Sequence, residues 1–448
     1  MNRIAGRSMV ALILCIALLL GFGFFVYEYG TNAHKWVVFP GSPHVYTGGN
    51  IGCGTVTDRE GNLLLTLNGD RVYAQDSLLR MATVHYLGDR KGSVSAPAIS
   101  HYSKQIVSFD LLNGIYVYGT TGSTAQMTLS GRLQKAALTA LGEKSGTVAV
   151  YNYQTGEILC AVTNPTFDPD GAIEEIDSMY LNRFTQGLYT PGSIFKIVTL
   201  AAALEDDPTI QNRLFTCTGE LIYGPDKITC EQPHGTQTLQ SAFRNSCNCA
   251  FAKIAEELGG EKMTAYAEKF GIVSSISFDG VTTVKGRYDV RDEAAVNIAW
   301  SGVGQFTDQI NPCAFLAFVG GIAAGGQGVL PYLVEEIRDG YKTIYQAEPT
   351  KRERIISEET AAVLQNYLRS NVQDKYGDGN FAGLTVCAKT GTAEVGGNKK
   401  PNAMLAGFAL DQNFPIAFII CVEDGGYGSQ ICIPIAQQIF AAIVDHTS

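Results

Sequence analysis

The feature that most constrains this chain is a long uncharged apolar run close to its N-terminus. The run from Met9 to Tyr27 has 19 residues without a charged side chain, and Arg3 and Arg7 precede it. As a helix it would extend about 28 Å, close to the hydrocarbon thickness of one bilayer. A cleaved signal peptide has a shorter apolar core and small residues at its cleavage site, which Thr31-Asn32-Ala33 matches poorly. A buried core helix is not expected at the extreme N-terminus next to two arginines.

These features predict an uncleaved membrane anchor with one transmembrane helix. Arginines beside a membrane span favour the cytoplasmic side, so Arg3 and Arg7 predict a cytoplasmic N-terminus. We expect residues 1–8 to form a cytoplasmic tail and residues 9–27 to form the anchor. Everything after Glu28 would then lie outside the cytoplasm.

Composition limits the classes of protein that the remaining chain can belong to. Of 448 residues, 46% are apolar and 17% are charged, which is too apolar for a disordered chain and sufficient for two or three folded domains. Asp and Glu number 43 against 33 Lys and Arg, giving a net charge of −10. This acidic balance argues against a nucleic acid partner, because phosphate contacts require clustered positive charge.

The chain has 11 cysteines and 6 histidines, without a C-x-x-C pair or a recognisable metal-ligand spacing. We therefore expect no metal site. Cys217 and Cys230 bracket a stretch rich in turn residues. The pair is either a hairpin disulfide or two small buried thiols, and the sequence favours neither.

Two regions of different character follow the anchor. Residues 28–125 are polar and glycine-rich, with two short strands predicted around the turn Arg59-Glu60-Gly61-Asn62. They carry no catalytic constellation, which is typical of a small strand-rich spacer or docking module. Residues 126–448 change pattern and are expected to form the catalytic domain.

The pattern over residues 126–448 predicts an α+β fold. A helix is expected over 129–141, followed by two strands at 146–151 and 157–162, and then by a long, mostly helical middle. Three further strands (384–388, 404–410 and 416–422) precede a closing helix over 435–444, with Pro434 in its first turn. This order predicts one antiparallel sheet closed by both ends of the domain, with helices on both faces.

The first motif with catalytic potential is Ser193-Ile194-Phe195-Lys196, which follows Pro191-Gly192 and opens a helical pattern. Three-residue spacing places Ser193 and Lys196 on one face, about one turn apart. A lysine with a lowered pKa can remove the proton of a serine nucleophile. Alone, the spacing is a weak signal, because Ser and Lys often lie on solvated helix faces.

The second motif is Ser246-Cys247-Asn248, ahead of another amphipathic helical run. The Ser246 hydroxyl is suited to proton relay, and the Asn248 amide to holding a substrate backbone. By itself, Ser-x-Asn is more often an ordinary helix cap.

The third motif, Lys389-Thr390-Gly391-Thr392, is predicted at the end of a strand. Lys389 and the threonine hydroxyls are suited to a terminal carboxylate. Gly391 would let a ligand backbone approach the strand edge. The alternative is a solvated turn after the strand.

The three motifs in this order resemble those of the class B penicillin-binding proteins, the monofunctional peptidoglycan transpeptidases. Residues 146–170, 181–205 and 234–259 resemble that family's first hairpin, nucleophile segment and second-motif region. The resemblance is close over about residues 125–448 and faint in the spacer, where it is mainly Asp58-Arg59-Glu60-Gly61-Asn62. It implies the fold shared by penicillin-binding transpeptidases and serine β-lactamases.

The resemblance also implies a role for each matching residue. Ser193 would be the acylated nucleophile, Lys196 its general base, Ser246 a proton relay and Asn248 a group that positions the acyl donor. Lys389, Thr390, Gly391 and Thr392 would bind the donor, and the backbone N–H groups of Ser193 and Thr392 would form the oxyanion hole.

The implied activity is a D,D-transpeptidase that cross-links peptidoglycan stem peptides ending in D-Ala-D-Ala and is acylated by β-lactams. The covalent route requires no metal or cofactor. The sequence shows no second catalytic domain for glycan synthesis, so the resemblance implies a membrane glycan polymerase as partner.

Two other functions remain possible for this sequence, and four residues depart from the family pattern. In a serine β-lactamase water would resolve the ester, and in a β-lactam sensor nothing would. Glu293-x-x-x-Asn297 offers only a superficial match to the deacylating glutamate of class A enzymes. A non-catalytic cell-wall scaffold is disfavoured by the intact motifs. The departures from the family pattern are Phe306, Asn311, Ala314 and Met404, where Gly, Thr, Gln and Trp are common.

Overall fold

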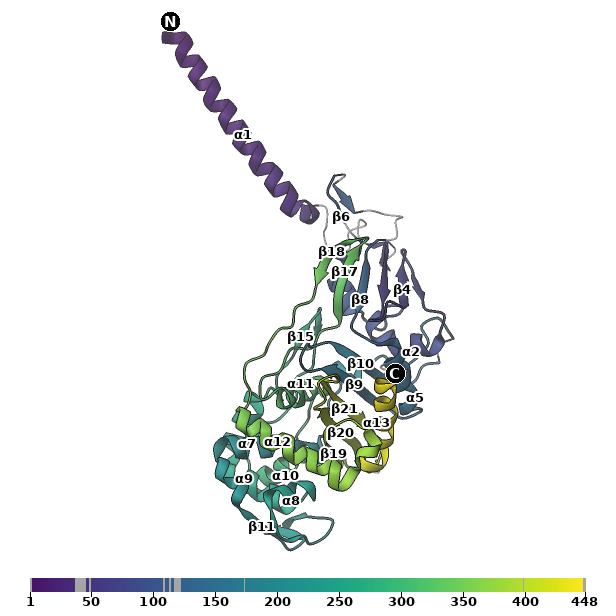
Figure 1. The fold of residues 1–448 in the computed structure, drawn as a ribbon, viewed down its shortest axis with the longest axis vertical. Helices are drawn as coiled ribbons and strands as arrows, with labels where there is room; N and C mark the ends of the chain where they lie inside the picture. Colours follow the sequence, from purple (N-terminus) through teal and green to yellow (C-terminus); the bar gives the residue numbers. More distant parts are fainter. Residues whose placement is uncertain are drawn as a thin grey trace.

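The structure, a computed structural model, describes residues 2–36, 46–47, 50–107, 109–112, 114–116, 122–172, 174–397 and 399–445. Its first element is one long helix, α1 (Asn2–Trp36), which projects away from the folded body (Figure 1). Within α1, the stretch Gly6–Ala33 is long and apolar enough to cross a membrane, and its most apolar window is not buried by the rest of the chain. The helix therefore extends beyond the predicted span of 9–27 at both ends.

The C-terminal part of the chain is built around a five-stranded antiparallel sheet with the order β10-β9-β21-β20-β19. Its strands are β9 (Gly146–Asn152), β10 (Ile158–Asn164), β19 (Val386–Ala393), β20 (Asn402–Ala409) and β21 (Ile416–Val422). The early strand β9 pairs with the late strand β21, with Ala149 opposite Ile419. Strands from both ends of the domain thus lie in one sheet, as the sequence predicted.

Both faces of this sheet are buried, because side chains alternate across a strand and both sets are apolar. Val148 and Val150 face a core that includes residues of α5 (Gly131–Leu141) and α13 (Gly428–Val444). Ala149 and Tyr151 face the opposite core, which contains α11 (Pro312–Ala323). The expected helical layers on both faces are therefore present.

The middle of the domain, between β10 and β19, is mostly helical, as expected. Besides α11 it contains α6 (Arg183–Gln186), α7 (Lys196–Asp206), α8 (Leu239–Arg244), α9 (Asn248–Lys269), α10 (Ala295–Gly302) and α12 (Glu358–Asn371). Short helical turns are η1 (Gly192–Phe195), η2 (Pro208–Asn212), η3 (Val372–Tyr376) and η4 (Asp378–Phe381). Three small two-stranded antiparallel sheets pair β11 (Leu214–Cys217) with β14 (Gly235–Thr238), β12 (Glu220–Tyr223) with β13 (Asp226–Thr229), and β15 (Ser277–Phe278) with β16 (Val281–Thr282).

The N-terminal module is more helical than its composition suggested. Its main strands are β3 (Gly54–Thr57), β4 (Leu63–Leu67), β5 (Arg71–Tyr73) and β8 (Thr124–Met127), with α2 (Ser77–Leu87), α3 (Pro97–His101) and α4 (Ser103–Val107). The two-residue strands are β1 (Tyr46–Thr47), β2 (Asn50–Ile51), β6 (Phe109–Asp110) and β7 (Ile115–Tyr116). The expected strands on either side of the Arg59–Asn62 turn are β3 and β4. Buried Asp58 shapes this turn by accepting hydrogen bonds from the backbone N–H groups of Glu60 and Asn62.

The sheet of this module is completed by strands from much later in the chain. Its order is β18-β17-β8-β3-β4-β5, where β17 (Val334–Asp339) and β18 (Lys342–Gln346) come from the catalytic half. Figure 1 shows these strands at the end of the folded body next to α1, with β11 at the opposite end. Strands from the early and the late part of the chain therefore share this sheet as well.

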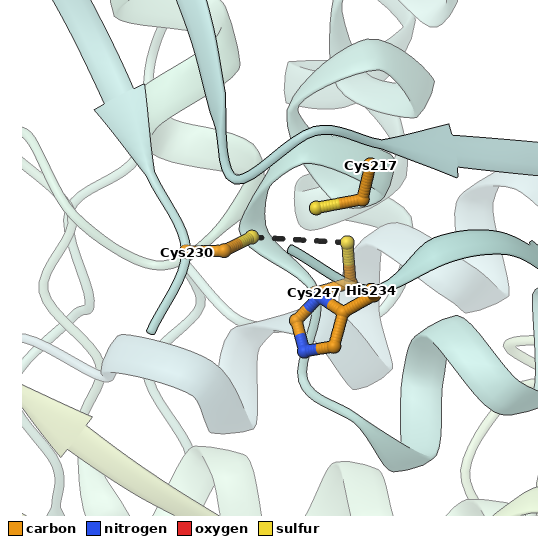
Figure 2. Close-up of side chains that lie close together, drawn as sticks. All are labelled: Cys217, Cys230, His234 and Cys247. Atoms are coloured by element: carbon orange, nitrogen blue, oxygen red, sulfur yellow. Dashed lines mark hydrogen bonds between the residues drawn. The ribbon is translucent and has the colours of Figure 1, made fainter. Parts of the chain in front are cut away.

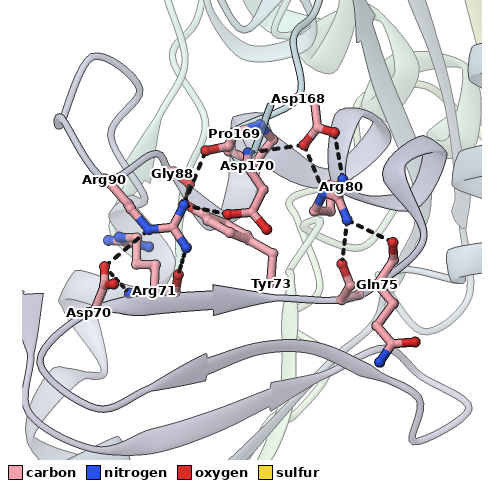
Figure 3. Close-up of polar contacts among 11 residues, drawn as sticks. Asp70, Arg71, Tyr73, Gln75, Arg80, Gly88, Arg90, Asp168, Pro169 and Asp170 are labelled. Atoms are coloured by element: carbon pink, nitrogen blue, oxygen red, sulfur yellow. Dashed lines mark hydrogen bonds and ion pairs between the residues drawn. The ribbon is translucent and has the colours of Figure 1, made fainter. Parts of the chain in front are cut away.

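Two arginines of the module also bind the loop after β10 (Figure 3). Arg80 on α2 contacts both carboxylate oxygens of Asp168, at 2.7 and 2.6 Å. Arg90 contacts Asp170 at 2.6 Å, and also reaches Asp70 at 3.1 Å within its own module. These ion pairs fix the orientation of α2 relative to the catalytic sheet.

Several predicted boundaries differ from the structure by one or two residues, and two differ by more. Helix α13 begins at Gly428, not at 435, so Pro434 lies inside it and removes only one backbone donor. Strand β19 continues to Ala393, because β20 pairs with it along its whole length, from Val386 opposite Ala409 to Ala393 opposite Asn402. The third motif is therefore part of the strand and not a turn after it.

Candidate active site

The turn that carries Ser193 is held tightly against strand β19. Ser193 lies in the 3-10 turn η1, and α7 starts at Lys196. Gly192 has a positive φ of 53°, and a Cβ atom there would lie 2.5 Å from the carbonyl oxygen of Thr392. Only glycine meets both conditions, so this residue allows the nucleophile turn to approach the third motif.

Lys196 is fully buried and connects the first motif with the second. Its Nζ lies 2.8 Å from Oγ of Ser193 and 2.7 Å from Oδ1 of Asn248. It also lies 3.2 Å from Oγ of Ser246 and 3.1 Å from the Ser246 carbonyl oxygen. The predicted Ser–Lys pairing is therefore present, in a buried setting rather than on a solvated helix face.

Ser246 stands between the nucleophile and the second lysine. It occupies the turn between α8 and α9 with a positive φ of 53°. Its hydroxyl donates to Oγ of Ser193 at 2.8 Å and accepts from Nζ of Lys389 at 3.1 Å. Ser193, Ser246 and Lys389 thus form a continuous chain of polar contacts, although they are far apart in the sequence.

Asn248 is the first residue of α9 and does not act as the helix cap, a role taken by Cys247. Its amide nitrogen donates to the carbonyl oxygen of Thr229 at 2.7 Å, while its oxygen accepts from Lys196. The second motif is therefore anchored to the end of β13.

The two lysines sit in an environment that disfavours their charge. Burial lowers the pKa of Lys196 to about 8. Burial, followed by the nearby charge of Lys196, lowers the pKa of Lys389 well below its usual value. A neutral Lys196 amine can accept the proton of Ser193, as nucleophile activation requires.

Thr390 and Thr392 are held by partners that sequence patterns did not identify. The hydroxyl of Tyr376, in η3, lies 3.0 Å from Oγ1 of Thr390 and accepts from the backbone N–H of Thr390 at 3.1 Å. Oγ1 of Thr392 accepts from the backbone N–H of Gly428 at 3.2 Å. No local pattern marks Tyr376, because its relation to the third motif exists only in the folded chain.

Gly391 is required for a different reason from the one expected. A Cβ atom at Gly391 would lie 2.9 Å from the Pro191 carbonyl oxygen and 3.2 Å from the Ile194 backbone nitrogen. The space beside Gly391 is therefore filled by the nucleophile turn rather than left for a ligand.

The three motifs open into one cleft with a volume of 650 Å³. From the predicted set, its lining includes Ser193, Ser246, Asn248, Lys389, Thr390 and Thr392. Buried Lys196 lies directly behind Ser193, and Gly391 packs against the same turn. The structure thus brings all eight predicted residues together.

The departures from the family pattern have structural explanations in two cases. Asn311 caps α11 through its side-chain oxygen, and its amide nitrogen donates to the carbonyl oxygens of Thr185 and Gly187 at 3.0 and 3.1 Å. Met404 is completely buried on β20, opposite Gly391. Phe306 is exposed, with a φ of 76°, and lines a separate pocket; nothing in the structure explains this substitution or Ala314.

Glu293, the residue considered for a deacylating role, is exposed and hydrogen-bonded to Asn297 at 2.7 Å. Glu293 is not one of the described residues that line the cleft. Its match to a lactamase motif is therefore coincidental.

Comparison with known proteins identifies a family whose members carry the same kind of domain. The family model for the penicillin binding protein transpeptidase domain matches residues 146–445. The chain belongs to the penicillin-binding protein transpeptidase family. The relatives described next confirm the resemblance to the class B penicillin-binding proteins.

Two of these relatives are each 30% identical to the chain. The peptidoglycan D,D-transpeptidase PbpA of Mycolicibacterium smegmatis aligns over 361 residues, 72% of each protein. Stage V sporulation protein D of Bacillus subtilis aligns with 73% of this chain and 51% of its own length.

Solved structures of penicillin-binding proteins share the fold. The D,D-transpeptidase domain of a peptidoglycan glycosyltransferase from Eggerthella lenta has a TM-score of 0.74 at 25% identity, over 88% of this chain and 99% of that one. Penicillin-binding protein A of M. tuberculosis, solved as an imipenem acyl-enzyme complex, has a TM-score of 0.77 at 23% identity, over 90% and 99%.

Proposed function

We propose that the chain is a peptidoglycan D,D-transpeptidase that works through an acyl-enzyme on Ser193. The observation that carries this proposal is the 2.8 Å distance between Oγ of Ser193 and Nζ of the buried Lys196. The curated relatives named peptidoglycan D,D-transpeptidases support the same reaction class.

In the first half-reaction, neutral Lys196 takes the proton of Ser193 while Oγ attacks the penultimate carbonyl carbon of a D-Ala-D-Ala stem. Backbone N–H groups of Ser193 and Thr392 stabilise the oxyanion in this scheme. As the carbon–nitrogen bond breaks, the proton passes through the Ser246 hydroxyl to the amine of the leaving D-alanine. The 2.8 Å contact between the two serine hydroxyls supports this relay.

In the second half-reaction, the amine of a neighbouring stem attacks the ester and loses a proton to Lys196. Ser193 leaves and regains its proton, which restores the resting site. Among the described residues, no carboxylate is hydrogen-bonded to Ser193 or Lys196. A base dedicated to activating water is therefore not in place, which favours the transpeptidase over the β-lactamase alternative.

Binding of the donor is assigned to the second and third motifs. Lys389, Thr390 and Thr392 line the cleft and offer one amino group and two hydroxyls to the terminal carboxylate. Asn248 also lines the cleft and positions the donor backbone through its amide. Gly391 acts indirectly, by letting the nucleophile turn pack on β19.

We further propose that α1 anchors the enzyme with its N-terminus in the cytoplasm and residues after 28 outside. The apolar stretch and the preceding arginines support this arrangement. A membrane glycan polymerase partner follows from the family resemblance, and an anchor in the same bilayer would hold the two enzymes close together.

Intact-mass spectrometry of the full-length protein with benzylpenicillin tests the proposal. We expect one persistent adduct per chain, on the peptide that contains Ser193, and none in Ser193→Ala. Ser429→Ala, which changes another serine of the cleft lining, serves as the matched control and should retain the adduct.

The natural reaction is measured as release of D-alanine from a D-Ala-D-Ala stem in the presence of an acceptor amine. Rapid turnover of the drug without a lasting adduct would support the β-lactamase instead. Absence of both the adduct and D-alanine release would leave only the scaffold alternative.

A further inference from the structure

Three cysteines and a histidine converge beside the catalytic cleft. Figure 2 shows the side chains of Cys217, Cys230, His234 and Cys247 gathered around one point. Their candidate ligand atoms all lie within 4.8 Å of one another. Cys217 and Cys247 are buried, and Cys230 and His234 are partly buried.

The four residues come from four separate elements. Cys217 ends β11, Cys230 directly follows β13, His234 directly precedes β14, and Cys247 caps α9. The pairing of β11 with β14, in which Cys217 lies opposite Gly235, brings the first and third of these together. Their convergence depends on tertiary structure, which is why the sequence spacing did not predict a metal site.

The sulfur geometry fits tetrahedral coordination. Zn–S bonds of about 2.3 Å at tetrahedral angles place two ligand sulfurs about 3.8 Å apart. The Sγ atoms of Cys230 and Cys247 lie 3.8 Å apart. A disulfide instead requires about 2.05 Å, and all the described cysteines are free thiols, so the Cys217–Cys230 disulfide considered from the sequence is not formed.

The groups around the cluster suit thiolate and imidazole ligands. The backbone N–H groups of Cys249 and Ala250 donate to the sulfurs of Cys230 and Cys247, both at 3.4 Å. Such bonds to ligand sulfur orient it and stabilise its negative charge. Nδ1 of His234 is buried and has no hydrogen-bond partner, which is an unusual state for a polar atom.

We propose that Cys217, Cys230, His234 and Cys247 bind one zinc ion. Three thiolates and one imidazole are a preferred ligand set for zinc in closed structural sites. Because four protein ligands complete the tetrahedron, the ion has no open position for substrate. Its role is therefore structural rather than catalytic.

The site would act on catalysis through the second motif. Cys247 lies between Ser246 and Asn248, and the Asn248 amide binds the carbonyl oxygen of Thr229, the residue before Cys230. Cys230 and His234 also line the catalytic cleft. A zinc ion shared by Cys230 and Cys247 would clamp β13 to the start of α9, which makes its ligands positioning residues for Ser246 and Asn248.

The full-length protein, purified in detergent with thiol reductant and added zinc, provides the test. After removal of unbound metal, elemental analysis should give one zinc per chain in the wild type. Cys230→Ser and His234→Ala should lose most of this zinc. Cys160→Ala, which removes a buried thiol of β10 outside the cluster, should retain it.

A cobalt titration of the wild type keeps the proposal independent of whether the variants fold. Tetrahedral Co²⁺ bound by thiolates gives intense visible ligand-field bands and a sulfur-to-cobalt charge-transfer band, and zinc should displace both. Removal of the zinc should also lower the Tm and slow benzylpenicillin acylation of Ser193, and re-addition of zinc should restore both.

Three results would overturn the proposal. These are a wild-type chain that takes up neither zinc nor cobalt, a cobalt spectrum without thiolate character, and a disulfide within the cluster in protein purified without reductant. A normal rate of acylation in zinc-free protein would show that the ligands do not position Ser246 and Asn248. The proposal of a zinc site would then depend on the measurement of one zinc per chain.

Discussion

Nζ of Lys196 lies 2.8 Å from Oγ of Ser193, and no part of the lysine side chain reaches solvent. An ammonium group buried in this way loses its hydration, so the neutral amine is favoured relative to a lysine in water. Burial of this lysine lowers the stability of the folded chain, but it also makes the amine available as a base near neutral pH. The acylation rate of Ser193 should therefore depend on this lysine and on pH.

Replacing Lys196 by alanine should abolish efficient acylation. Among the described residues, Ser193 would then keep only the Ser246 hydroxyl as a hydrogen-bond partner. Loss of one acid–base group costs about 10²–10⁴-fold in rate. Stopped-flow acylation by a fluorescent penicillin measures the effect. Lys375→Ala, which removes another lysine of the cleft lining, should leave the rate within a few-fold of wild type. A similar rate for Lys196→Ala would assign the base elsewhere.

The acylation rate should rise with pH and level off above the pKa of Lys196, which is lowered to about 8. Below this value the amine carries a proton and cannot accept another, so the rate falls about tenfold per pH unit at the acidic end. Burial also lowers the pKa of the neighbouring Lys389, so this lysine loses its charge at a lower pH than an exposed lysine would, and that loss would weaken carboxylate binding. A profile that stays flat across neutral and mildly alkaline pH would contradict a lysine base.

Tyr376→Phe should weaken donor binding without preventing acylation. The hydroxyl supports both the backbone N–H and the side chain of Thr390, at 3.1 and 3.0 Å. Loss of a neutral hydrogen bond costs about 0.5–1.5 kcal/mol, or ~2–12-fold in the second-order acylation rate. Tyr367→Phe, on α12 and in contact with Phe243, is the matched control and should change this rate little. Equal effects of the two variants would argue against a specific role for Tyr376.

Arg80→Met should destabilise the contact between the module and the catalytic domain. The Arg80–Asp168 pair is bidentate and mostly buried, with side-chain exposures of 14% and 19%. We expect the free energy of unfolding to fall by about 1–3 kcal/mol, because the unpaired Asp168 carboxylate remains partly desolvated. Arg213→Met breaks an exposed pair with Glu257 and should cost less than about 1 kcal/mol. Denaturant unfolding of both variants measures the difference.

Protease treatment of wall-stripped cells tests the topology. If α1 spans the membrane with the N-terminus inside, added protease should digest the chain beyond residue 36, while a tag before Asn2 stays protected. Membrane permeabilisation should then expose the tag as a control. Complete protection of the catalytic domain in intact cells would show the opposite orientation.

Much of the fold and most of the site could be predicted from the sequence, because those features have local signatures. The apolar run of α1, the strand patterns of β9, β10 and β21, and the order of the Ser-x-x-Lys, Ser-x-Asn and Lys-Thr-Gly motifs depend on neighbouring residues in the chain. Such periodicities and motif residues are set by 3.6- and 2-residue repeats and by the chemistry of each side chain. Element boundaries were less certain, as the early start of α13 shows.

Only the tertiary structure decided which distant residues meet. Tyr376 reaches Thr390, and Gly391 serves the nucleophile turn, because η3, η1 and β19 pack together. The cluster of Cys217, Cys230, His234 and Cys247 likewise has no regular spacing, since two small two-stranded sheets and a helix start supply its members. Contacts of this kind depend on how whole elements pack, which residue spacing along one chain does not encode.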